Sequence, residues 1–507
     1  MHNLMNHLND YEYLRRKRPN GIWERRYIRN VIFQMLRKLR PYNTVPQELD
    51  LMVRYIVHIS LIETNWLTVA SILMDAMPTC PYTKVVIALI IRNIPSPNAY
   101  TVSTLLNDRF HLSQRRAVAA SIPVRVEKNI CIVLNCLAEK LVGTNSTVIF
   151  TDNVCSYLCH IFINSRYHND LELQMRALLA LEKFSVIREN KTMIVQRLEL
   201  LNSNHLSGLE KYLTNIAGEE IRREVGYCAR WALDNIFPKP GRQLSYDTVD
   251  LSAVNCMFKN ESGNIYIKYS PDLMEIRNDT ICPQTLHGTS EVDGGLWFYE
   301  VKLITDGSIT VGWGSTGANT EISVGDEERS LGYEGNKMTF WYHGKAYGIS
   351  LTRWRADDVL GCLLDSSEKT ISFFLHGAES SITCFDFFSP SNTPKKYFPA
   401  ITMTAFQQCE VNFGQVRFRS APVGSRFDAL NTVGHLTPQQ RMIYGMPRHA
   451  MQQQQATYNA SEDACDICCD LVADVTLHPC GHRTLCHACS MKILVCPVCR
   501  ADIAERR

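Results

Sequence analysis

The chain has 507 residues, of which 21% are charged, and its formal net charge at pH 7 is +2. This length suggests roughly three domains, and the balanced charge gives no whole-protein field that would attract nucleic acid or a membrane. Residues 1–20 lack the apolar core of a signal peptide, and no apolar stretch reaches the roughly 18 residues of a membrane span. We therefore expect a cytoplasmic protein, with the nucleus as the alternative, and no transmembrane segment or specific nucleic-acid partner.

The 19 cysteines are unevenly distributed, and eight of them lie between Cys465 and Cys499. The others, such as Cys131 and Cys362, stand singly in apolar segments and are typical of reduced, buried thiols. The clustered cysteines indicate metal ligands.

Residues 1–240 are predicted to be helical. In residues 27–39 the apolar side chains of Ile28, Ile32 and Met35 share one helical face. Similar segments follow at residues 51–62, 66–77, 84–94, 129–141, 154–163, 170–187 and 219–236. Helices of this length joined by short loops favour an armadillo-like solenoid. Because no repeat of fixed spacing is found, an irregular helical bundle is the alternative.

The N-terminal segment is strongly basic. Residues 15–40 contain ten basic residues and the single acid Glu24. Such a segment could bind an acidic partner, lipid headgroups or a nuclear import receptor. The simpler interpretation is a solvated helix face whose apolar side docks on the next helix.

In residues 249–419 the apolar side chains recur at every second residue instead of with helical spacing. Short β-branched and aromatic segments at residues 297–302 and 371–375 are separated by turns such as His343-Gly344 and His376-Gly377. Many short strands with this spacing predict an antiparallel β-sandwich.

Residues 420–460 are predicted to be a flexible linker. They contain Pro422, Pro438 and a glutamine run at residues 452–455, a composition that buries little apolar surface. One short helix near residues 437–444 is compatible with this pattern.

The strongest motif lies in residues 461–507. Close pairs of soft ligands, separated by eleven, three and six residues, are formed by Cys465, Cys468, Cys480, His482, Cys486, Cys489, Cys496 and Cys499. Each pair can supply one edge of a zinc tetrahedron, so the eight donors predict two structural Zn²⁺ ions. With every position filled by protein, no metal-bound water can be activated. Metal binding must supply much of the folding free energy of so small a segment.

Seven cysteines with one histidine in fourth place resemble the C3HC4 RING finger. The resemblance implies cross-brace wiring, in which the first and third pairs share one zinc and the second and fourth pairs share the other. Sequential pairing is the alternative. Cys469 falls outside the pattern and is expected to be an unliganded thiol. A nucleic-acid finger is disfavoured because the first half is acidic, with Asp463, Asp466, Asp470 and Asp474.

A RING finger implies a partner, a ubiquitin-conjugating enzyme that carries ubiquitin, and it implies no catalytic residue on this chain. By position, Ile467 and Pro497 resemble the residues that contact the conjugating enzyme, and Arg500 resembles the residue that bridges it to ubiquitin. A guanidinium suits bridging because it donates several hydrogen bonds in a fixed fork. The alternatives are that Ile467 and Pro497 only pack the small fold and that Arg500 is solvated. A RING-mediated dimer is also compatible with the resemblance.

Several stretches of the predicted sandwich resemble a SPRY domain. They are residues 296–301 (LWFYEV), 311–314 (VGWG), 358–365 (DVLGCLLD), 371–377 (ISFFLHG) and 397–400 (YFPA). The resemblance implies a domain that binds a protein substrate or peptide through its loops. Trp297, Trp313 and Trp341 either line a groove or, as we expect, fill the core. Asp357, Asp358 and Asp365 are expected in turns and at strand edges.

The order of helical region, SPRY domain and C-terminal RING resembles the RING finger and SPRY domain-containing protein family, which implies a ubiquitin ligase. The substrate is expected to bind the SPRY domain, the helical region or both. A non-catalytic adaptor, in which the RING dimerises or recruits another ligase, is the alternative. A zinc enzyme would require an open metal position.

Overall fold

The computed structural model describes residues 21–38, 46–109, 123–141, 144–200, 205–213, 219–348, 351–389, 395–422, 424, 426–450, 465–467, 471–499 and 501–507. The chain divides into two compact units, Met1–Leu206 with Ser461–Arg507, and Ser207–Ala460. Among the described residues, no helix combines the length and apolar character needed to cross a membrane.

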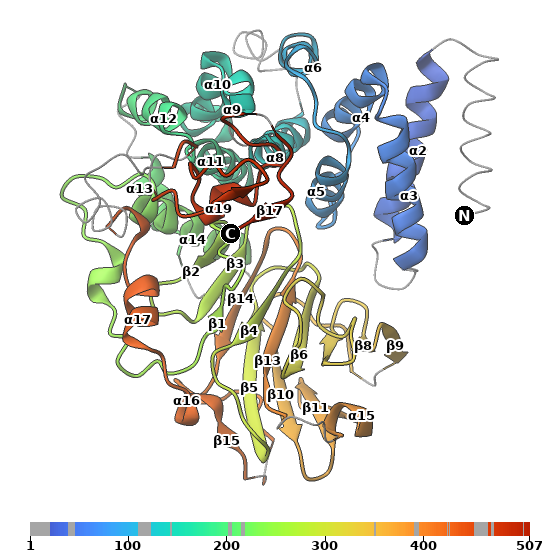
Figure 1. Cartoon of the computed structure of the whole chain (residues 1–507), viewed down its shortest axis with the longest axis vertical. Coiled ribbons are helices and arrows are strands. Elements are labelled where there is room, and N and C mark those ends of the chain that lie inside the picture. The colour runs from blue at the N-terminus through green and yellow to red at the C-terminus, as the bar shows by residue number, and fades with distance from the viewer. Residues whose placement is uncertain are drawn as a thin grey trace. The chain divides into compact units, whose positions relative to one another are not determined.

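The N-terminal part of the first unit is helical, as predicted (Figure 1). Its α-helices are α2 (Gly21–Lys38), α3 (Pro46–Ile59), α4 (Glu63–Asp75), α5 (Thr83–Asn93), α6 (Ala99–Thr104), α8 (Val124–Lys140), α9 (Thr144–Ile149), α10 (Asp152–Ile163), α11 (Leu171–Phe184) and α12 (Arg188–Leu200). In α2 the side chains of Ile28, Ile32 and Met35 are fully buried. The apolar face of the basic helix therefore docks on the helical core. Residues 1–20, which include the first basic residues, lie outside the described part.

Two of these helices form the centre of the helical region. Both α8 and α11 bury most of their side chains. The carboxylate of Asp170 caps α11 by accepting a hydrogen bond from the Leu173 amide at 2.9 Å, a contact that stabilises a helix by about 1 kcal/mol. At the other end, Lys183 of α11 pairs with Glu139 of α8 at 2.5 Å, and both side chains are largely buried. These contacts fix α8 and α11 to each other.

The helix α14 (Glu220–Asn235) belongs to the second unit rather than to the helical region that we predicted to extend to residue 240. Arg223 pairs with Glu410 at 2.9 Å, and Glu224 pairs with Arg277 at 3.1 Å. The charges of α14 therefore neutralise charged side chains of the strands, which is why this helix joins the sandwich. The short helix α13 (His205–Glu210) spans the boundary between the units.

The rest of the second unit contains the predicted antiparallel β-sandwich, with two large sheets (Figure 1). The strand order in one sheet is β1 (Phe258–Lys259), β4 (Gln284–Gly288), β13 (Tyr397–Met403), β6 (Ile309–Ser315), β7 (Ser330–Glu334), β8 (Thr339–Tyr342) and β9 (Lys345–Gly348). The order in the other is β12 (Ala378–Thr383), β11 (Thr370–Leu375), β10 (Val359–Asp365), β5 (Leu296–Leu303), β14 (Gln407–Asn412), β3 (Glu275–Asn278) and β2 (Ile267–Tyr269).

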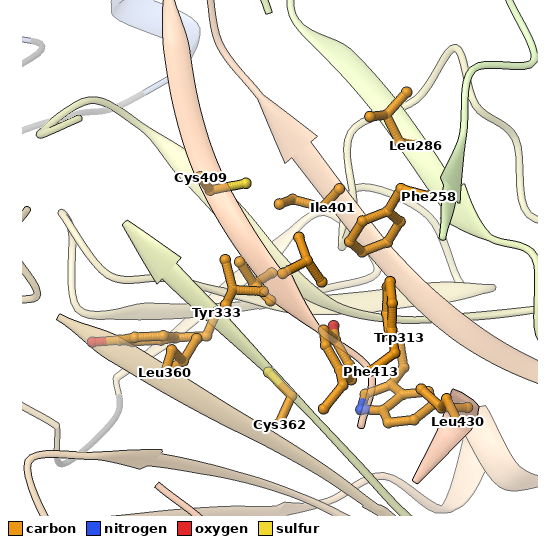
Figure 2. Close-up of a cluster of buried hydrophobic side chains, with 14 of the residues drawn as sticks. Phe258, Leu286, Trp313, Tyr333, Leu360, Cys362, Ile401, Cys409, Phe413 and Leu430 are labelled. Carbon is orange, nitrogen blue, oxygen red and sulfur yellow. The ribbon is translucent and has the colours of Figure 1, made fainter. Parts of the chain in front are cut away.

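The three tryptophans considered for a groove do not share one environment. Trp313 is completely buried, and Figure 2 shows it in the apolar core with Phe413 and Leu430. Trp297 and Trp341 are half-buried; the Trp297 indole donates to the Gly294 carbonyl at 2.6 Å. Trp313 is therefore a core residue, whereas Trp297 and Trp341 remain partly exposed.

Two hairpins use histidine where the chain turns. His343 and His376 both have φ = 52°, and each is followed by a glycine with positive φ. Consecutive residues with positive φ are the geometry of the tight turns that suit the twist of paired strands. The turns join β8 to β9 and β11 to β12, as the sequence predicted.

The predicted flexible linker differs from the structure. Residues 426–450 pack in the second unit, where β15 (Asp428–Ala429) pairs with β5 and α16 (Leu430–Val433) follows. Leu430 and Leu436 are buried in the core of the sandwich. The predicted short helix is α17 (Pro438–Tyr444), whose start has a Thr437 and Gln440 capping box. The two apolar anchors Leu430 and Leu436 are enough to hold the polar residues 426–450 on the sandwich. Residues 451–460 lie outside the described part.

Candidate metal centre

Two groups of ligand side chains form in the C-terminal segment. In the first, the donor atoms of Cys480, His482, Cys496 and Cys499 lie within 4.8 Å of one another. In the second, those of Cys465, Cys486 and Cys489 lie within the same distance. The last predicted ligand, Cys468, lies outside the described residues. The described side chains are thus grouped in the cross-brace order, and sequential pairing disagrees with this geometry.

Local backbone structure presents these side chains. The strand β16 (Leu477–His478) leads into a turn in which the Gly481 amide donates to the Leu477 carbonyl at 2.6 Å, and the Leu477 amide donates to the His482 carbonyl at 2.8 Å. Gly481 has φ = +75°, a conformation that glycine adopts at no steric cost. The turn therefore places Cys480 and His482 on one side of the same short loop.

The second group is built on a single helical turn. Cys486 precedes α19 (His487–Ser490), and its carbonyl accepts hydrogen bonds from the amides of Cys489 at 3.2 Å and Ser490 at 2.9 Å. This turn brings Cys489 back beside Cys486. The strand β17 (Glu505–Arg506) pairs with β16 and closes the segment.

The donor set fits zinc. Thiolates and an imidazole are the ligands of structural zinc sites, and four donors within one small sphere match its tetrahedral coordination. The Nδ1 atom of His482 is buried and has no hydrogen-bond partner among the described residues. A buried, unpaired ring nitrogen is costly unless something binds it, so a metal ion accounts for its position.

The structure places the predicted partner-contacting residues in different environments. Pro497 is exposed, whereas Ile467 is only 7% exposed and belongs to a cluster of buried apolar side chains. This cluster also contains Ile187, which lies between α11 and α12 and is 6% exposed. Arg500 lies outside the described residues. The structure therefore does not present Ile467 and Pro497 as one open surface.

Other residues of this segment were not singled out by the sequence. Leu494 is 81% exposed and Val498 is 52% exposed, so they extend the apolar surface around Pro497. The Lys492 ammonium is buried. Burial lowers the pKa of Lys492, while Cys489 and Glu139 act in the opposite direction. The sequence signal for Leu494 and Val498 was a run of apolar residues in a segment that is too small to bury all of them.

The aspartates of the sandwich have the structural roles that we expected. Asp358 accepts a hydrogen bond from the Arg355 amide at 2.6 Å and pairs with His376 at 2.7 Å. Asp365 accepts hydrogen bonds from the amides of Ser367 and Glu368. These carboxylates hold turns.

The sandwich also carries an open hollow of about 680 Å³ at the ends of β6, β7 and β8. Its lining includes the charged residues Arg329, Lys345, Lys395, Glu328 and Asp386. Tyr342 and Tyr347 add aromatic surface.

Two family models match the chain. Residues 296–416 match the SPRY domain, and residues 461–506 match the zinc finger of C3HC4 type, the RING finger. These matches fall on the sandwich and on the segment that contains both ligand groups.

Three curated proteins are similar to short regions of the chain. One stretch of 128 residues is 31% identical to the E3 ubiquitin-protein ligase RKP of Arabidopsis thaliana and covers 25% of this chain and 10% of that protein. Another, of 144 residues, is 28% identical to the ATP-dependent RNA helicase Ddx1 of Drosophila melanogaster and covers 27% of this chain and 18% of that protein. A stretch of 47 residues is 40% identical to the putative apoptosis inhibitor ORF42 of Ostreid herpesvirus 1 and covers 9% and 13%. The chain spans less than a fifth of the length of each of these relatives.

Solved structures that match part of the chain include two SPRY domains. That of human HERC1 is 13% identical with a TM-score of 0.27, and covers 32% of this chain and 99% of that structure. The TRIM65 PSpry domain is 16% identical with a TM-score of 0.25, and the match covers 31% of this chain and 91% of that structure.

Proposed function

We infer that this chain, which combines a helical N-terminal region, a SPRY domain and a C3HC4 RING finger, is a RING-type ubiquitin-protein ligase. The observation that carries the proposal is the grouping of Cys480 and His482 with Cys496 and Cys499, while Cys465 groups with Cys486 and Cys489. This cross-brace arrangement occurs in a segment that matches the RING family. The similarity of one stretch to a ubiquitin-protein ligase supports the same activity.

The RING would hold two structural Zn²⁺ ions. Cys465, Cys468, Cys486 and Cys489 would ligate one ion, and the group that contains His482 would ligate the other. Bound zinc would supply folding free energy here and no activated water, because the eight protein donors would fill all four positions of each ion. The zinc ions thus shape a surface and leave the chemistry to a partner.

That partner is a ubiquitin-conjugating enzyme that carries ubiquitin as a thioester. Ile467 and Pro497 would supply apolar contacts to it, and Arg500 would donate hydrogen bonds to both the enzyme and ubiquitin. In the reaction, a substrate lysine amine attacks the thioester carbonyl, the amide bond forms, and the conjugating enzyme's thiol leaves. The RING accelerates this step by positioning, and no ubiquitin becomes attached covalently to this chain as an intermediate.

The SPRY domain would hold the substrate. The hollow at the ends of β6, β7 and β8 is our candidate contact surface, because its tyrosines and charges of both signs suit a polar peptide or loop. Proximity labelling with the intact chain and with an Arg329→Glu/Tyr347→Ala variant would test this role. Loss of the same proteins from the labelled set would support it, and an unchanged set would contradict it.

A non-catalytic adaptor is the second candidate function. The burial of Ile467 favours it, because a RING that only scaffolds partners has no need of an exposed docking residue. Reduced, scattered cysteines support a cytoplasmic or nuclear setting for either function.

Reconstituted ubiquitin transfer separates the two candidates. The purified chain would be mixed with ubiquitin, activating enzyme, ATP and a panel of conjugating enzymes, and ubiquitin release from the conjugating enzyme would be measured. The ligase proposal expects release that is lost in Ile467→Ala and in Arg500→Ala, with zinc content retained because neither residue is a ligand. Val433→Ala, at an exposed apolar side chain of the second unit, is the control. No release by the wild type or by the Ile187→Asp variant described below would favour the adaptor.

A further inference from the structure

The docking residue of the proposed ligase is covered. Ile467 must be accessible to contact a conjugating enzyme, yet it is 7% exposed. The other half of the expected contact surface is open, since Pro497 is exposed together with Leu494 and Val498. The RING therefore presents half of the surface that its partner needs.

The helical region of the same unit contributes to the buried cluster that contains Ile467. Ile187 belongs to the same buried apolar cluster as Ile467, and Val186 packs against this cluster. Both lie in the short segment between α11 and α12. This segment is fixed, because the Ile187 amide donates to the Phe184 carbonyl at 3.3 Å and its own carbonyl accepts from the Lys191 amide at 2.9 Å.

We propose that the segment at Val186 and Ile187 is an intramolecular cover that keeps the conjugating enzyme from Ile467. This inference rests on the proposed ligase function. Because only the fraction of molecules with a free Ile467 can bind, the cover weakens the apparent affinity for the conjugating enzyme by that fraction. A partner that binds this segment of the helical region would release the RING.

The test replaces Ile187 with a charged residue. In the full chain, Ile187→Asp places a carboxylate in the apolar cluster, which disfavours the covered state. We expect about tenfold tighter binding of the conjugating enzyme and about tenfold faster ubiquitin release. Ile187→Leu keeps the apolar contact and should behave like the wild type. Ile221→Asp makes the same change at a partly exposed isoleucine of the second unit and should leave both values unchanged.

The expected increases in affinity and in ubiquitin release must depend on Ile467. Ile187→Asp combined with Ile467→Ala should lose the increase. Zinc content and circular dichroism would verify folding, and Val186→Asp, at a half-buried position, is the substitute if Ile187→Asp does not fold. Wild-type affinity and release rate in the folded Ile187→Asp protein would overturn the cover and leave the ligase proposal intact.

Hydrogen exchange distinguishes a failure of the cover proposal from a failure of the ligase proposal. If no conjugating enzyme binds either protein, the ligase proposal fails, and the amides of the peptide that contains Ile467 then decide whether the cover exists. Faster exchange of this peptide in Ile187→Asp than in Ile187→Leu supports the cover. Equal exchange in the two variants overturns it.

Discussion

The sulfur atoms of Cys465 and Cys486 lie within 4.8 Å of each other, although Cys480 and His482, which belong to the other ligand group, lie between them in the sequence. The two groups are therefore interleaved along the chain. Neither half of the segment contains a complete site, so each metal would hold together residues that the other metal also constrains. Loss of one ion should weaken the binding of the other.

Removing one ligand tests this coupling. Cys465→Ser and Cys496→Ser disrupt different groups, yet we expect both to reduce zinc from about two ions per chain to well below one. Metal analysis after gel filtration would measure it, and limited proteolysis should show cleavage within residues 461–507. Cys469→Ser, outside the ligand pattern, is the control and should retain both ions. A loss of only one ion in each variant would show that the sites are independent.

The completely buried Trp313 should be essential to the stability of the sandwich. Its removal leaves a large cavity beside Phe413 and Leu430 (Figure 2), so we expect Trp313→Ala to lower the free energy of unfolding by about 3–5 kcal/mol. Trp297→Ala, at a half-buried position, should lower it less. Urea unfolding followed by circular dichroism would compare them, and equal losses would contradict the larger contribution that we expect from the buried Trp313.

The stability of the second unit should also depend on the buried charge cluster between α14 and the strands. Arg277 is completely buried and pairs with Asp279 at 2.7 Å and with Glu224 at 3.1 Å. Arg277→Ala leaves both carboxylates without this partner, so we expect a loss of about 3–5 kcal/mol. Arg329→Ala, at a half-exposed arginine, is the control. Protease sensitivity of residues 219–236 should rise in Arg277→Ala, and full protection there would argue against our assignment of α14 to this unit.

The sandwich should lose stability in acid because of His287. Burial lowers the pKa of His287 from its ordinary 6.5 to about 4, with Glu261 acting in the opposite direction. Between these values the unfolded chain takes up a proton that the folded chain does not, so the free energy of unfolding falls as the pH drops from about 7 to 4. The loss from this one group is at most about 3 kcal/mol.

The comparison that isolates this effect is His287→Gln against the wild type. Urea midpoints at pH 7 and pH 5 should differ less in His287→Gln than in the wild type, and His343→Gln controls for the loss of an exposed histidine. Identical pH dependence in the wild type and in His287→Gln would contradict the expectation.

Much of the architecture could be read from neighbouring residues in the sequence. The turns at His343 and His376, the apolar face of α2 and the ligand spacing from Cys465 to Cys499 depend on residues close together in the chain. Helix α14 and residues 426–450 were harder to place. Breakers near residue 240 suggested a boundary there, and the polar composition after residue 420 concealed the anchors Leu430 and Leu436.

The sequence by itself determined which elements form and which atoms can bind metal, because hydrophobic periodicity, turn chemistry and ligand spacing act over a few residues. Only the tertiary structure decided that Trp313 lies in the core, that α14 joins the sandwich and that Ile467 is buried with Ile187. Each of these outcomes depends on surfaces that are distant in the chain, and the free energy of burying them is set by the shape and charge of both partners together.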